Sequence, residues 1–199
     1  MSEPTPGLHP AQNRALRELY AFGRQLAAHW SRLAGRLGAG AASDALRAGA
    51  DAARELLGEL ADLTADYGLY GFPAAQGVGA RLAGVRNVVG DRTLERNQAL
   101  RMAVHDVQHL TTLLAYLAAL GEAAGDERMR DFCARWERKL KRHESAVRRA
   151  AVAAAEEPDA AIEPLDRTAA GRAGHGLANA MGTFGEWFDR RAAQRRRSG

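Results

Sequence analysis

Among the residue types in this sequence, histidine is the one whose positions most clearly suggest a chemical role. His105 and His109 stand four positions apart in a segment whose apolar residues recur at helical spacing. Side chains four apart on a helix project from the same side, and two imidazoles placed in this way can bind one divalent transition metal ion. We therefore predict that His105 and His109 supply part of a metal site.

His143 is the third candidate ligand. It interrupts an apolar stripe between Leu140 and Val147, and His29 lies near the apolar stripe of an earlier segment. If the helices that carry these residues meet, two or three imidazoles come together. Carboxylates available to complete the site are Glu18, Asp106 and Glu144. The alternative is that each histidine is a hydrogen-bonded residue of the core.

Cysteine and serine give little support for nucleophilic catalysis. Cys133 is the single cysteine, which excludes an internal disulfide and a multi-cysteine metal site. It stands on an apolar stripe beside Phe132 and Trp136, so we interpret it as a small buried hydrophobic residue. The sequence contains no Gly-x-Ser-x-Gly motif of the kind that presents a catalytic serine.

Positive charge is concentrated in two segments, although the formal net charge is only +4. Residues 126–150 contain nine Lys or Arg and five Asp or Glu, and residues 189–199 contain five Arg and one Asp. Clustered arginines, including Arg195, Arg196 and Arg197, could bind an acidic partner or nucleic acid through phosphate contacts. The alternative, which we favour, is a solvated helix face and a basic tail, because no aromatic residues alternate with the tail arginines.

The last apolar segment is rich in aromatic residues. This patch consists of Phe184, Trp187 and Phe188, which cover a wide arc over one and a half turns of the expected helix. Such a patch suits contact with two surfaces at once. It either binds a second subunit or seals the open end of a monomeric bundle.

The elements that would position these residues are all helical. The chain has 199 residues, of which 46% are hydrophobic and 6% aromatic, and alanine is the commonest type. Apolar residues recur at three- and four-residue spacing, which predicts amphipathic helices. We expect an all-α, antiparallel helical bundle of four main helices plus a fifth C-terminal helix. Expected helices run from about 9 to 37, 43 to 67, 91 to 120, 126 to about 156, and from about 167 onwards.

Glycine, proline and capping residues set the expected boundaries. Residues 1–8 form a disordered lead, residues 9–195 a single domain, and residues 196–199 a basic tail. A long Gly-rich connection occupies residues 68–90. Ser43, Asp91 and Asp126 are the expected N-caps of the second, third and fourth helices.

A bundle with inward metal ligands resembles the ferritin-like proteins in architecture. That family supplies two Glu-x-x-His units on separate helices, together with further carboxylates. This chain has no Glu-x-x-His unit, and the nearest segment is Asp106-Val107-Gln108-His109, with Asp in place of Glu. The resemblance therefore implies a metal-binding bundle, enzymatic or sequestering, but it transfers no ligand from the family to this chain.

Two arginine–histidine pairs resemble the motif of the HEPN superfamily of all-helical ribonucleases. Four residues separate Arg24 from His29, and four separate Arg138 from His143. The resemblance implies that Arg holds the scissile phosphate while His moves a proton. The inward position expected for His143 argues against access by RNA.

The sequence therefore predicts a non-catalytic, self-associating helical bundle that binds a partner or serves a structural role. A metal-binding bundle with a divalent transition metal is the first alternative, and a nucleic-acid-binding or HEPN-like protein is the second. The longest wholly apolar run, residues 113–120, is too short to cross a bilayer, and the N-terminus lacks the pattern of a signal peptide. We expect a cytoplasmic protein without a membrane partner.

Overall fold

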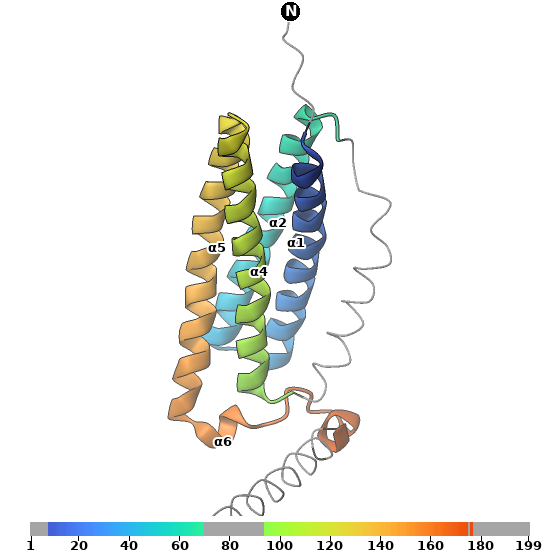
Figure 1. The fold of residues 1–199 in the computed structure, drawn as a ribbon. Helices are drawn as coiled ribbons and strands as arrows, with labels where there is room; N and C mark the ends of the chain where they lie inside the picture. The colour runs from blue at the N-terminus through green and yellow to red at the C-terminus, as the bar shows by residue number, and fades with distance from the viewer. Residues whose placement is uncertain (1–7, 70–93, 175, 177–199) are drawn as a thin grey trace, which may run out of the picture.

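Four long helices dominate the fold. The computed structural model describes residues 8–69, 94–174 and 176. The long helices are α1 (Pro10–Leu37), α2 (Ala41–Asp66), α4 (Arg96–Ala123) and α5 (Glu127–Ala153), followed by the 3-10 turn η2 (Ala154–Glu156) and the short helix α6 (Pro158–Ala161) (Figure 1). No strand occurs within these ranges, and the predicted all-α bundle is confirmed. None of the described helices is long and apolar enough to cross a membrane.

The helices form two antiparallel hairpins that pack side by side. One hairpin is α1 and α2, joined through residues 38–40, and the other is α4 and α5, joined through residues 124–126. Between the hairpins, α1 packs against α4 and α2 packs against α5. We call these two contacts the α1–α4 seam and the α2–α5 seam. Figure 1 shows α4 beside α1, with α2 behind them and α5 on the other side of α4.

Contacts near the helix ends define the direction of each helix. The hydroxyl of Tyr67, just after α2, donates a hydrogen bond to Asp126 at the start of α5 (2.5 Å). At the opposite end of the bundle, the Arg96 side chain at the start of α4 reaches the carbonyl of Leu37 (3.3 Å). Helices α2 and α4 therefore run in the same direction, and each helix is antiparallel to both of its neighbours, as in four-helix bundles with one long crossover.

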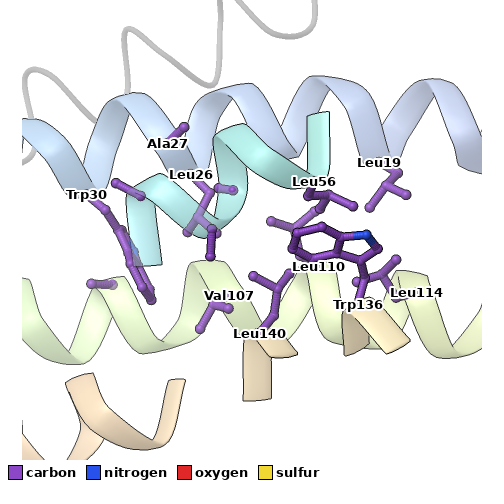
Figure 2. Close-up of a cluster of buried hydrophobic side chains, with 14 of the residues drawn as sticks. Leu19, Leu26, Ala27, Trp30, Leu56, Val107, Leu110, Leu114, Trp136 and Leu140 are labelled. Carbon is purple, nitrogen blue, oxygen red and sulfur yellow. The ribbon is translucent and has the colours of Figure 1, made fainter. Parts of the chain in front are cut away.

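The core is the shared interior of the four helices. Figure 2 shows leucines from α1, α2 and α4 around the indole of Trp136 from α5, with Trp30 further along the interior. Trp30 and Trp136 are both fully buried. The α1–α2 hairpin packs closely because Gly49 has no Cβ, and a Cβ there would overlap the Trp30 ring. The apolar stripes that predicted the helices face this interior, with Phe22 and Leu57 at its edges.

Ser43 does not cap α2 as predicted. The helix begins two residues earlier, at Ala41, after Gly40. Ser43 is buried, and its hydroxyl donates to the carbonyl of Ala34 in α1 (2.7 Å). A tertiary hydrogen bond between the two helices therefore replaces the expected cap.

The third predicted helix begins later than expected. Asp91, its predicted N-cap, lies outside the described residues, and α4 starts at Arg96 after Glu95. Leu94 and Glu95 are not helical, because they pair with the chain that follows α6. The carbonyl of Leu94 accepts from the amide of Leu165 (3.0 Å), and Glu95 forms an isolated antiparallel bridge with Pro164.

The turn between α4 and α5 agrees with the sequence in part. Asp126 caps α5, as predicted, by accepting from the amide of Met129 (3.0 Å). Gly121, predicted to end the preceding helix, instead lies within α4 and is buried. A Cβ on Gly121 would stand 2.9 Å from the backbone nitrogen of Arg130, so the close approach of the two helices requires glycine.

Several predictions fall on residues that the structure does not describe. Residues 169–174 are helical, in agreement with the start of the fifth predicted helix, but most of that helix lies beyond them. Most of the 1–8 lead, most of the 68–90 connection and all of the 196–199 tail also lie outside the described residues. Candidate partner-binding residues outside the described ranges are Phe184, Trp187, Phe188, Arg195, Arg196 and Arg197.

Candidate functional site

A buried histidine and a carboxylate join α1 to α4. His29 of α1 is 3% exposed, and its Nδ1 lies 2.7 Å from Oδ2 of Asp106 on α4. A carboxylate can only accept a hydrogen bond, so Nδ1 of His29 carries the proton in this contact. The sequence placed His29 near the inner face of its helix, and the structure confirms that position.

A second histidine–carboxylate pair crosses the same seam nearer to solvent. Nε2 of His109 on α4 lies 3.0 Å from Oε1 of Glu18 on α1. The Phe22 ring packs beside the imidazole, with ring centroids 4.3 Å apart and planes tilted by 51°. The His109 side chain is 42% exposed, so this pair remains accessible to solutes.

A small pocket separates the two pairs. It has a volume of about 160 Å³ and lies between α1 and α4. Its lining comprises Phe22, Gln25, Leu26, His105, Asp106 and His109. His105 and His109 therefore border one cavity, as the four-residue spacing predicted, and the cavity mixes apolar walls with imidazole and carboxylate groups.

His143 does not join this group. It is half-buried on α5, and the charged groups that act on it are Lys139 and Arg142 of its own helix and Glu55 of α2. Burial lowers the pKa of His143 below its usual value, and the two cations lower it further. The structure thus brings His105 and His109 to the α1–α4 seam and leaves His143 at the α2–α5 seam.

The described residues do not assemble a complete metal site. Across residues 8–69 and 94–174, no group of three or more His, Cys, Asp or Glu side chains is arranged to hold a metal ion. The carboxylates considered as ligands have other partners: Glu18 contacts His109, Asp106 contacts His29, and Glu144 accepts from Gln108 (2.9 Å).

The α2–α5 seam is held by strongly basic side chains. Arg135 of α5 contacts both carboxylate oxygens of Glu59 on α2 (2.6 and 3.4 Å), and the Trp136 indole donates to the same group (3.1 Å). The hydrogen bond from Arg135 is the main reason that the pKa of Glu59 is lowered. Lys139 bonds Glu55 (2.5 Å) and also lies over the Trp136 ring.

These ion pairs explain part of the positive charge of residues 126–150. Arg128, Arg135 and Lys139 of α5 pair with Asp66, Glu59 and Glu55 of α2, respectively. A groove of about 670 Å³ follows this seam, and its lining includes three arginines and three carboxylates. Three of the nine basic residues in this segment therefore pair with carboxylates of the neighbouring helix.

The two arginine–histidine pairs occupy different environments. His29 is buried and bonded to Asp106, so it is inaccessible to a nucleic-acid backbone in this fold. Arg138 is exposed and lines the α2–α5 groove, whereas His143 is half-buried.

Cys133 is fully buried, and burial raises the pKa of its thiol to about 12, which disfavours the nucleophilic thiolate.

The outer faces of α4 and α5 differ sharply in composition. From Glu127 to Arg149, every exposed residue of α5 except Ser145 is charged. In α4 no Asp, Glu, Lys or Arg occurs between Asp106 and Glu122. Met102 and Tyr116 of α4 are 49% and 50% exposed, respectively.

The exposed residues of α4 follow a regular spacing. Its outer stripe consists of Met102, His105, His109, Thr112 and Tyr116, which we call the α4 stripe. Steps of three, four, three and four residues are those of a helix that packs against another helix. The four-residue spacing placed His105 and His109 on one side of the helix, but it did not distinguish that side as an interaction surface. The signal in the sequence that could have identified this surface is the absence of charged residues between Asp106 and Glu122.

Comparisons with family models, with curated proteins and with solved structures give no match for this chain.

Proposed function

We propose that this protein is a non-catalytic helical bundle that self-associates through the α4 stripe. The observation that carries the proposal is the α4 stripe, which has no charged residue among its five members and in which Met102 and Tyr116 are half exposed. Depletion of charge together with Met and aromatic residues is typical of the centre of a protein–protein interface.

Charge favours a second copy as the occupant of this face. In a symmetric dimer the same surface patch lies on both subunits, so a surface with strong charge of one sign repels itself. The exposed face of α5 carries many arginines, whereas the α4 stripe carries none. Two copies can therefore bring their α4 stripes together without burying like charges against each other.

The length of α4 is sufficient for such an interface. A helix of 28 residues is about 42 Å long. Specific interfaces bury about 800 Å² on each partner, which two long helices and their flanking residues can supply. Phe22 and Gln25 of α1 lie beside the stripe at the pocket and widen the surface.

The test is the molar mass in solution, measured by size-exclusion chromatography with multi-angle light scattering on untagged protein. We expect a mass of twice 21.4 kDa for the natural chain. The double variant Met102→Glu with Tyr116→Glu is expected to be monomeric, because a dimer would have to bury four carboxylates.

A matched control uses Val152 (66% exposed) and Ile162 (56% exposed), the two other large apolar residues that are exposed in the part of the chain that the structure describes. Both lie outside α4, so Val152→Glu with Ile162→Glu should leave the dimer intact. A natural chain that stays at 21.4 kDa at every concentration contradicts the proposal, as does equal dissociation of both double variants.

A further inference from the structure

Two histidines that face solvent lie at the centre of the α4 stripe. His105 and His109 are both exposed, stand one helical turn apart and border the same pocket. Imidazoles at this spacing on one helix face can bind the same transition metal ion, as in helical zinc sites. Two ligands leave the coordination shell of such an ion incomplete.

The hydrogen bond from His109 to Glu18 favours metal binding by His109. Its carboxylate accepts from Nε2–H of His109, so in the neutral imidazole the lone pair is on Nδ1. Histidines that bind metals commonly donate the other ring N–H to a carboxylate, which fixes the tautomer and increases the basicity of the ligand. The contact from α1 therefore orients His109 with its free lone pair available.

The remaining ligands have no source within the described part of the chain. No third His, Cys, Asp or Glu is arranged with this pair as a metal group, and Asp106 is held by His29 at 2.7 Å. His143, the third ligand expected from the sequence, lies at the other seam. The proposed self-association would bring further ligands from a second molecule.

We propose that His105 and His109 form half of a divalent transition-metal site, which the same two histidines of a second copy complete. The inference rests on the proposed self-association through the α4 stripe. If the outer faces of two α4 helices pack antiparallel, with the two-fold axis midway between His105 and His109, then His105 stands opposite His109 of the partner subunit. Four imidazoles then surround the axis, which is the ligand number that Zn²⁺ prefers.

The uncharged stripe is compatible with this ligand set. Four neutral imidazoles leave the charge of the ion uncompensated at the axis, and the Glu18 carboxylate of each subunit, bonded to His109, offsets it. Zn²⁺ serves as the probe because imidazole nitrogen is among its preferred ligands. Metal binding then stabilises the dimer by mass action.

The test combines light scattering with isothermal titration of ZnCl₂ into chelator-treated, untagged protein. We expect about one Zn²⁺ per two chains and a dimer that persists at lower protein concentration when Zn²⁺ is present. His105→Ala and His109→Ala should each abolish this binding, while His143→Ala should retain it. Glu18→Ala should lower the Zn²⁺ affinity by about 10- to 100-fold, and circular dichroism checks that each variant remains helical.

The outcomes separate the metal site from self-association. A stable dimer that binds no Zn²⁺, or whose binding survives His109→Ala, overturns the metal site and leaves the proposed function standing. One Zn²⁺ bound by each monomer also overturns the shared site. A chain that is monomeric with and without Zn²⁺ overturns both proposals.

Discussion

The α1–α4 seam and the α2–α5 seam occupy equivalent places between the two hairpins, but different ionic groups hold them. The first seam uses His29 with Asp106 and His109 with Glu18. The second uses arginine and lysine with glutamate and aspartate, beside the buried Trp136. Arginine and lysine stay charged near neutral pH, whereas histidine is the side chain whose charge changes there.

This difference suggests separate roles for the two seams: the α2–α5 seam holds the hairpins together, and the α1–α4 seam carries groups that can bind a ligand. A seam of arginine–carboxylate pairs keeps its charge pattern over the whole neutral range, so it holds the hairpins together under all these conditions. The imidazoles of the α1–α4 seam are the groups that can offer lone pairs to a metal ion. This contrast is the reason to place structural support at the α2–α5 seam and interaction at the α1–α4 seam.

The largest expected effect comes from removing the centre of the α2–α5 seam. Trp136→Ala should lower the free energy of unfolding by about 3–5 kcal/mol, because a fully buried indole leaves a cavity among the four helices. Urea denaturation followed by circular dichroism measures the loss. Trp136→Phe, which keeps an aromatic ring but loses the hydrogen bond to Glu59, should cost clearly less. Equal losses would show that packing is not what Trp136 contributes.

The buried pair of the α1–α4 seam comes next. Asp106→Ala should cost about 1–3 kcal/mol of unfolding free energy, because His29 loses the acceptor of its Nδ1 proton inside the bundle. Asp106→Asn keeps an acceptor oxygen and should recover much of that loss in the same urea titration. If Asn and Ala at position 106 are equally destabilising, the hydrogen bond is not the source of the effect.

The exposed ion pair of the α2–α5 seam should contribute less. Glu59→Gln is expected to cost at most about 1 kcal/mol, because ion pairs near solvent are weak. The pKa of Glu59 is lowered in the folded chain by Arg135, so the contribution is present above the unfolded value of 4.5 and is lost as the pH falls through the folded value.

Thermal unfolding between pH 8 and pH 3 measures this dependence. The difference in stability between Glu59→Gln and the natural chain should be constant from pH 6 to 8 and shrink under acid conditions. Glu156→Gln, at an exposed position in η2, is the matched control and should show no such trend. A difference that grows as the pH falls would contradict the assigned cause.

The smallest expected effect concerns His143, the histidine at the otherwise permanently charged seam. Its pKa is lowered in the folded chain, first by burial and then by Lys139 and Arg142. The unfolded chain therefore binds more protons below about pH 6.5, and folding stability falls as the pH decreases through that region. His143→Gln should reduce this loss between pH 7.5 and 5.5 by a fraction of 1 kcal/mol, measured by urea denaturation. A difference between His143→Gln and the natural chain that stays the same from pH 7.5 to 5.5 would contradict the explanation.

Local sequence patterns predicted the helices well where the signal was itself local. The apolar spacing of Leu19, Leu26 and Leu33 predicted α1, and Asp126 was recognised as the cap of α5 from its own type and position. The predicted ends were wrong where tertiary contacts intervened. Ser43 bonds to α1 instead of capping α2, and the pairing of Glu95 with Pro164 delays the start of α4.

The candidate site was predictable only in half. His105 and His109 lie on one side of α4 because helical geometry relates residues four apart, whatever the rest of the chain does. Glu18 and Asp106 were recognised as possible oxygen donors, but their actual partners, His109 and His29, lie 91 and 77 positions away in sequence. Such pairs depend on which helices are neighbours, and periodicity carries no information on that order.

The sequence by itself determined that the chain folds into amphipathic helices, which residues face inward, and that two histidines share one helix face. The reason is that a helix repeats every 3.6 residues, so its buried and exposed sides can be recognised from the chain alone. The tertiary structure decided that α4 packs beside α1, and α5 beside α2. That arrangement set the imidazoles against carboxylates at one seam and the arginines against carboxylates at the other, because complementary side chains can pair only where their helices touch.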